Sequence, residues 1–76
     1  MWKSPDGKLF GYAVAAVLYE LAHDMEAETY VRQYAPQTYL WLRHLERTRD
    51  TRRTTRFDVF LGQLLRRQGY AYLEPT

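Results

Sequence analysis

Apolar side chains recur every three or four residues along several stretches of the chain, which is the period of one face of an α-helix. In the first stretch the alanines at positions 13, 15, 16 and 22 are strong helix formers, and they let a neighbouring element approach closely. Apolar residues also occupy other faces of this segment, so we predict a central helix over residues 9–23. The repeating positions of its main stripe are Phe10, Val14, Val17, Leu18, Leu21 and Met25.

The first stripe loses its phase near His23 and Asp24, where a second helix is expected to begin. Continuing the stripe would require apolar residues at positions 28 and 32, and Glu28 and Arg32 stand there instead. Asp24 is expected to cap the new helix, since a side-chain oxygen at this position accepts from the free amides of the first turn. The new stripe consists of Ala27, Tyr30, Val31, Tyr34, Thr38, Trp41, Leu42 and Leu45.

Pro36 interrupts the second stripe without changing its phase. Proline lacks an amide donor, and it disfavours helical geometry at the preceding residue, Ala35. Two arrangements therefore stay open. The segment forms either one kinked helix from residue 25 to about residue 50 or two helices over residues 25–35 and 37–50.

A last helix is predicted over residues 56–68. Thr55 and Asp58 approximate a capping box at its start, and Gly69 suits the left-handed position that ends a helix. Gly62 either weakens this helix or admits a close neighbour. Its apolar face carries Phe57, Phe60, Leu61, Leu64 and Leu65.

The two ends of the chain are expected to be extended. Residues 4–7, Ser-Pro-Asp-Gly, form a turn signature within an arm whose Trp2 is expected to fold back on the core. The alternating tail 70–73 has only this arm as a strand partner. Residues 61–75, LGQLLRRQGYAYLEP, resemble the helix-to-wing junction of winged-helix regulators, which implies a helix ending at Gly-Tyr followed by a strand. A returning wing strand has no counterpart in the sequence.

The predicted fold class is all-α: a compact bundle of three to four short helices with an extended N-terminal arm and C-terminal tail. A chain of 76 residues fits one small helical domain, 1–76, with a thin core, because it buries only about 60% of the surface of its unfolded form. The expected core consists of Phe10, Val14, Val17, Leu21, Val31, Leu42, Leu45, Phe57, Phe60, Leu61 and Leu64.

The net charge of +2 conceals an asymmetry along the chain. Residues 1–31 hold two lysines and five acids, which gives −3, whereas residues 32–76 hold nine arginines and four acids, which gives +5. Residues 43–56, RHLERTRDTRRTTR, contain six arginines and two acids and net +4. Clustered arginine favours an acidic partner, because its planar guanidinium binds phosphate or carboxylate through two parallel hydrogen bonds.

The arginines after Leu45 lie beyond the last position of the apolar stripe, so they form either a solvated helix end or a docking edge. Arg43 with Glu46 is one weak surface pair expected within the segment. Arg66 and Arg67 are candidates to join the edge, and the nearby rings are candidates to stack on bases. The candidate binding residues are Arg43, Arg47, Arg49, Arg52, Arg53, Arg56, Arg66, Arg67, Trp41 and Tyr39.

The sequence offers few groups for catalysis or metal binding. It lacks cysteine, and its one serine, Ser4, lies in a turn signature without a base at a defined spacing. The His23-Asp24 pair is interpreted as a helix cap rather than a metal site, because only His44 is left as a further histidine. We therefore predict a protein that is not an enzyme and that needs no cofactor and no metal. The longest uncharged run, Leu9–Tyr19, has eleven residues and is shorter than the ~20 of a membrane span, so no membrane partner is expected.

These features predict a small non-catalytic regulatory module that docks through its arginine-rich edge on nucleic acid or on a nucleic-acid-handling complex. Two alternatives stay open. One is a protein-only adaptor or inhibitor, of the kind that mobile elements and phages encode, that binds an acidic protein surface. The other is a self-associating assembly subunit, such as a homodimer. The absence of cysteine agrees with a cytoplasmic location.

Overall fold

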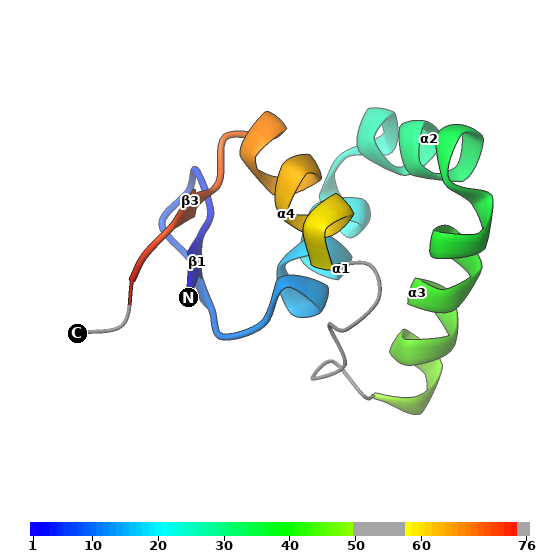
Figure 1. Ribbon diagram of the computed structural model, residues 1–76, viewed down its shortest axis with the longest axis horizontal. Helices are drawn as coiled ribbons and strands as arrows, with labels where there is room; N and C mark the ends of the chain where they lie inside the picture. The colour runs from blue at the N-terminus through cyan, green and yellow to red at the C-terminus, as the bar shows by residue number, and fades with distance from the viewer. Residues whose placement is uncertain (50–57, 75–76) are drawn as a thin grey trace.

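The computed structural model describes residues 1–49 and 58–74, and this part of the chain forms four helices and three short strands. In Figure 1 the small sheet lies at one side, α1 and α4 occupy the middle, and α3 runs down the far side with α2 across the top. The predicted all-α bundle is confirmed. The elements in chain order are β1 (Trp2–Lys3), β2 (Leu9–Phe10), α1 (Ala13–His23), α2 (Met25–Tyr34), α3 (Pro36–Thr48), α4 (Asp58–Arg67) and β3 (Ala71–Tyr72).

The arm and the tail pair with each other in an antiparallel sheet of order β2-β1-β3. Trp2 of the central strand lies opposite Phe10 on one side and Tyr72 on the other. This pairing corrects the predicted start of the first helix. Residues 9 and 10 belong to the ladder with β1, so α1 begins at Ala13 rather than at residue 9.

The Ser-Pro-Asp-Gly turn joins β1 to β2 and fastens the hairpin to α1. The Ser4 hydroxyl donates to the Asp6 carboxylate and accepts from the Lys8 amide at 2.8 Å. The Tyr19 hydroxyl of α1 donates to Asp6 Oδ2 at 2.6 Å. The hydrogen bond from Ser4, followed by that from Tyr19, lowers the pKa of Asp6. Gly7 has a φ of 93°, a conformation that glycine adopts at little cost.

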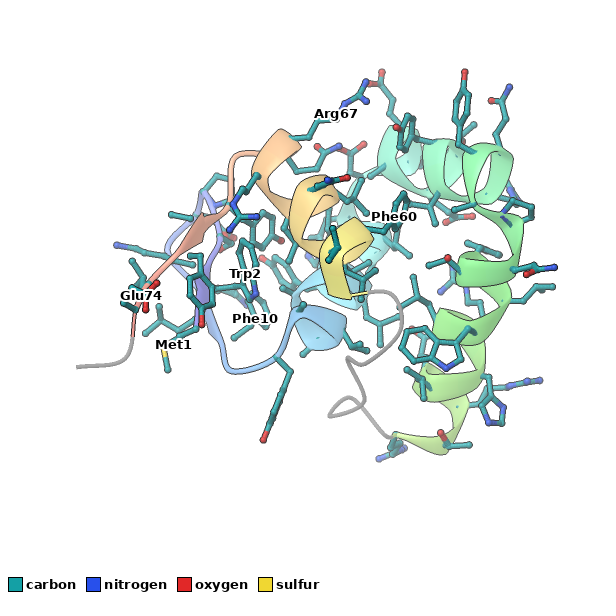
Figure 2. All side chains as sticks on the ribbon, in the orientation of Figure 1. Met1, Trp2, Phe10, Phe60, Arg67 and Glu74 are labelled. Atoms are coloured by element: carbon teal, nitrogen blue, oxygen red, sulfur yellow. The ribbon has the colours of Figure 1, made fainter. Side chains whose placement is uncertain are left out.

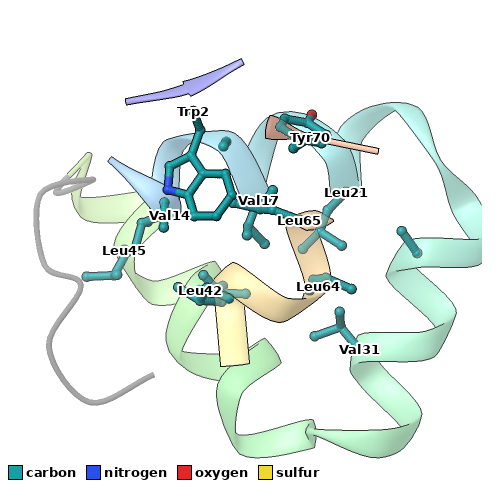
Figure 3. Close-up of a cluster of buried hydrophobic side chains, with 14 residues drawn as sticks. Trp2, Val14, Val17, Leu21, Val31, Leu42, Leu45, Leu64, Leu65 and Tyr70 are labelled. Atoms are coloured by element: carbon teal, nitrogen blue, oxygen red, sulfur yellow. The ribbon is translucent and has the colours of Figure 1, made fainter. Parts of the chain in front are cut away.

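α1 is the centre of the core, as the sequence predicted, and it packs against α2, α3, α4 and β2. Figure 3 shows side chains from the central strand, the helices and the tail meeting in one cluster. Eight predicted core residues are buried: Val14, Val17, Leu21, Val31, Leu42, Leu45, Leu61 and Leu64. The cluster also contains Trp2, Leu65, Tyr70 and the alanines at 13, 16 and 27.

Some of the predicted apolar positions contribute less than expected. Phe10 and Phe60 are only partly buried and pack on the rim of the core. For Phe10 the reason is that it belongs to an edge strand rather than to α1. Met25 is 83% exposed at the start of α2, since the chain changes direction at Asp24 before the first stripe reaches it. The predicted core residue Phe57 lies outside the described residues.

Both predicted helix boundaries around α2 have clear physical causes. Asp24 caps α2, with its Oδ1 accepting from the amides of Glu26 at 2.9 Å and Ala27 at 3.3 Å. Pro36 breaks the helix rather than kinking it, because Ala35 leaves helical geometry at φ −143° and ψ 62° and Pro36 becomes the first residue of α3. α2 and α3 therefore point in different directions, as Figure 1 shows.

α4 ends at Arg67, and Gly69 terminates it from the C′ position, as the sequence predicted. Gly69 has a φ of 91°, and the amides of Gly69 and Tyr70 donate to the carbonyls of Arg66 and Leu65, which is a Schellman motif. The following strand β3 agrees with the local helix-to-strand order of the winged-helix resemblance. Gly62 is buried, and the Trp2 ring would lie 3.6 Å from a Cβ placed there. This is an ordinary van der Waals distance, so the packing of Trp2 does not require a glycine at this position. The proposed capping pair of Thr55 and Asp58 falls outside what the structure describes.

The hydrogen bond between Tyr70 and Glu20 predicts a loss of stability at alkaline pH. The buried Tyr70 hydroxyl donates to Glu20 Oε1 at 3.1 Å, and burial, followed by this hydrogen bond, raises the pKa of Tyr70 far above its ordinary 10.0. The unfolded chain loses the tyrosine proton near pH ~10, so the stabilisation is complete below that pH and is lost as the pH rises above it.

Urea denaturation followed from about pH 8 to about pH 11 measures this dependence. We expect the midpoint to fall above pH ~10, and to fall less steeply in Tyr70→Phe. A residual slope is expected from Tyr19, whose pKa is raised by its hydrogen bond to Asp6. Exposed Tyr72 provides the matched control, Tyr72→Phe. Equal slopes in the two variants would contradict the prediction.

Candidate nucleic-acid interface

α3 has a buried side, and the side directly opposite it carries no acid; exposed Glu46 lies between the two and pairs with Arg43. Thr38, Leu42 and Leu45 are buried against the rest of the protein. The opposite side, spaced by three or four residues, consists of Gln37, Leu40, His44 and Arg47, all of which are exposed. We call these four residues the outer face of α3. They combine an amide, an imidazole and a guanidinium with one aliphatic side chain on one helix.

Arg47 and Arg49 are the cations of the predicted edge that are exposed at the end of α3. Within residues 1–49 and 58–74, neither guanidinium forms an ion pair. Arg49 ends the helix in the left-handed conformation with a φ of 59°, and its amide donates to the carbonyls of Glu46 and Leu45. Two cations therefore lie at a helix end where neither is held by a carboxylate of the described structure.

Arg43 belongs to a network that joins α3 to α2. Its guanidinium lies 3.0 Å from Glu46 Oε1, which confirms the expected surface pair, and 3.4 Å from Glu28 Oε2 on α2. Its Nε also donates to the Tyr39 hydroxyl at 3.1 Å, and the guanidinium carbon lies 5.0 Å from the centre of the Tyr39 ring. The Tyr39 hydrogen bond, followed by that to Glu46, raises the pKa of Arg43. Two of the candidate residues are thus already paired within the protein.

The other aromatic and arginine candidates are distributed as follows. Trp41 is half-buried on α3 and packs against the rim of the core. Three candidates, Arg52, Arg53 and Arg56, fall outside the described residues. Within residues 43–56, the arginines that the structure describes as exposed are therefore Arg47 and Arg49.

Arg66 and Arg67 lie away from the C-terminal end of α3. Figure 1 shows α4 running toward the sheet and α2, whereas α3 ends on the other side of the molecule. The guanidinium carbon of Arg66 lies 5.1 Å from the centre of the Trp2 ring of β1, and that of Arg67 lies 4.6 Å from the Tyr30 ring of α2. Figure 2 shows Arg67 at this end of α4. The structure therefore does not bring these two arginines together with Arg47 and Arg49.

Gln37, Leu40 and His44 were not among the residues predicted from the sequence. The prediction was based on arginine content. Gln37, Leu40 and His44 are instead identified by their positions on the helix opposite the buried stripe of Thr38, Leu42 and Leu45. The same helical periodicity that identified the core face thus also identifies the outer face.

The residues considered for catalysis or metal binding, His23 and Ser4, have structural roles. His23 Nδ1 lies 2.8 Å from the Tyr19 carbonyl, and Ser4 is 3% exposed within its turn. Among the residues that the structure describes, no group of three or more histidine, aspartate or glutamate side chains is placed to hold a metal ion. Over the same residues, no helix is both long enough and apolar enough to cross a membrane.

Comparisons with protein-family models, with curated proteins and with solved structures found no match to this chain.

Proposed function

We propose that the protein is a small non-catalytic regulatory module that binds nucleic acid through the outer face of α3 and the arginines at its C-terminal end. The observation that carries the proposal is the exposed, acid-free outer face, which includes Arg47 and is followed at the end of the helix by exposed Arg49. Neither arginine has a carboxylate partner in the described structure. A single helix of this width fits the major groove of a duplex. A cytoplasmic location is part of the same proposal.

The residue types on the outer face support base contacts as well as phosphate contacts. Glutamine pairs with adenine and arginine pairs with guanine through two hydrogen bonds, and an aliphatic side chain such as Leu40 contacts the thymine methyl group. Arg49, with the three arginines that follow it in sequence, supplies the phosphate attraction that gives most of the affinity. The helix would thus determine the position of the protein and its sequence preference together.

The backbone of Arg49 gives a second argument. A residue with a side chain in the left-handed region costs about 1–2 kcal/mol, which glycine avoids. An arginine at a φ of 59° is therefore a poor choice for stability alone. A charge that is useful at this position explains why the strain is tolerated.

The affinity for duplex DNA as a function of salt concentration tests the proposal. Fluorescence anisotropy with a duplex of about 20 base pairs, between about 50 and 200 mM salt, should give log K falling linearly with log salt. We expect Arg47→Gln to weaken binding and to reduce the slope by about 1, which corresponds to one lost phosphate contact. The matched control is Arg32→Gln on α2, where the side chain is 59% exposed and lies 3.8 Å from Glu28.

Arg49→Gly separates binding from folding. This variant removes the charge and the backbone strain together. We therefore expect it to bind DNA more weakly, while its free energy of unfolding rises by roughly 1 kcal/mol or less and its denaturation midpoint moves to a higher denaturant concentration. Weak binding in a more stable protein cannot result from unfolding. Binding that does not depend on salt, or that falls equally in Arg32→Gln, would refute the nucleic-acid proposal.

One observation favours the alternative of an acidic protein partner. Leu40 is 66% exposed in the middle of the outer face, and an exposed leucine beside arginines suits a protein interface as well. In that case Leu40→Ala would abolish capture of the partner protein, and DNA would not compete. For the third alternative, a self-associating subunit, sedimentation of the protein alone would show a mass that rises with concentration.

A further inference from the structure

A pocket of about 420 Å³ lies between the small sheet and α4, on a part of the protein that the proposed function does not use. Its volume is in the range of small-molecule sites, which is roughly 300–1,000 Å³. No residue of the outer face of α3 lines it. Its principal walls are Trp2, Tyr12, Tyr72, Val59, Gln63 and Arg66.

The walls of the pocket are aromatic and half-open to solvent. Tyr12 is 48% exposed and Tyr72 is 44% exposed, so both side chains retain surface that a ligand can contact. Beside them, Trp2 is held in the core and meets Tyr72 edge-on, with 5.1 Å between the ring centres. Figure 2 shows Trp2 between the strands and α4. Partly exposed aromatic side chains at a concave surface suit a flat ring, which gains by offset or edge-on packing.

Arg66 gives the pocket its charge. The guanidinium lies over the Trp2 ring, 5.1 Å from its centre, so packing holds it in place rather than an acid. In the described structure Arg66 forms no ion pair, and no aspartate or glutamate side chain lines the pocket. Gln63, one turn before Arg66 on α4, adds an amide at the same wall. The Arg66 guanidinium can therefore form an ion pair with an anionic ligand.

The positive end of α1 also lies at this pocket. Gly11, Tyr12 and Ala13 line it, and Tyr12, the N-cap residue, makes no capping hydrogen bond with its side chain. The first turn of α1 contains no acid, so the partial positive charge of the helix end is not compensated there. This field adds to that of Arg66.

We propose that this pocket binds a small aromatic carboxylate, with its ring against Tyr12 and Tyr72 and its carboxylate on Arg66. One guanidinium matches one carboxylate through two parallel hydrogen bonds. A phosphate group is the weaker match, because it carries nearly two negative charges at pH 7, whereas Arg66 is the one arginine or lysine among the described residues that line the pocket. The ligand would occupy the sheet end of the protein and leave the outer face of α3 open.

Titration of the ¹⁵N-labelled protein with indole-3-acetate, followed by amide and indole N–H chemical shifts, tests the proposal. We expect saturable shifts of the Trp2 indole N–H and of the amides of residues 11–13. Indole-3-acetamide, which has the same ring without the charge, is expected to bind at least about tenfold more weakly, because charge-assisted hydrogen bonds are roughly twice as strong as neutral ones. Adenosine 5′-monophosphate is the phosphate-bearing arm and is also expected to bind more weakly.

Two arginine variants on adjacent positions of α4 complete the test. Arg66→Gln is expected to weaken indole-3-acetate binding at least about tenfold, and Arg67→Gln is expected to stay within about twofold, because Arg67 lies over Tyr30 and does not line this pocket. Arg66→Lys keeps a cation on packed Trp2 and is expected to bind with intermediate affinity. If the amide spectrum of Arg66→Gln shows that this variant does not fold, Arg66→Lys takes its place in the comparison with Arg67→Gln.

Four results would overturn the proposal: no saturable shift, equal affinity for the acetate and the acetamide, tighter binding of the nucleotide, or equal loss in the Arg66 and Arg67 glutamine variants. DNA binding need not change in any of these experiments. Failure here is therefore distinguishable from failure of the nucleic-acid proposal.

Discussion

Trp2→Ala is expected to lower the free energy of unfolding by about 3–5 kcal/mol, the usual cost of removing a buried tryptophan. Trp2 is 7% exposed, lies on the central strand, contacts Tyr72 on the neighbouring strand and lies against Gly62 of α4. A domain of this length has only on the order of 4–11 kcal/mol of stability. The change should therefore remove a large part of the total and release both the arm and the tail.

Chemical denaturation measures this loss, and Tyr72→Ala is the matched control. Tyr72 contacts the Trp2 ring, but it is 44% exposed and lies on an edge strand, so its removal should cost about 1 kcal/mol. In Trp2→Ala, hydrogen exchange should also be faster at the Leu73 amide, which donates to the Met1 carbonyl in the wild-type protein. If the two variants are equally stable, Trp2 does not anchor the sheet to the helices.

The parts of the fold that depend on neighbours in sequence were predictable. The helical stripes identified eight buried core residues, and the cap at Asp24 and the end at Gly69 follow from the chemistry of single residues. The outcome at Pro36 was open because a kink and a break use the same residue pattern. The structure decides for a break, since Ala35 adopts extended rather than helical φ.

The parts that depend on distant pairing were not predictable. Leu9 and Phe10 continue a helical stripe, yet they form a strand because β1 offers them backbone partners. Trp2, far from α4 in the sequence, packs against the guanidinium of Arg66. Arg43 appears in the sequence as one more cation of a cluster, but Glu28 on α2 pairs with it once the chain turns at Ala35. Charge counted along the sequence therefore overestimates the charge that one face presents.

Leu42→Ala is expected to cost about 2–5 kcal/mol, whereas Leu40→Ala is expected to cost about 0.5 kcal/mol or less. Both changes remove the same side chain from the same helix, two residues apart. Leu42 is fully buried, whereas Leu40 is 66% exposed. The difference between the two variants therefore measures burial alone, and urea denaturation is the direct test.

The same pair of variants also connects the fold to the proposed interface. Leu42 is one of only three buried residues that α3 contributes in the described structure, so its loss should free α3 from the core and weaken DNA binding in proportion to the unfolded fraction. Leu40→Ala leaves the fold intact, so any loss of binding in that variant must come from the outer face itself. If Leu42→Ala left both stability and DNA binding unchanged, the packing of α3 on the core and its role in positioning the interface would both be wrong.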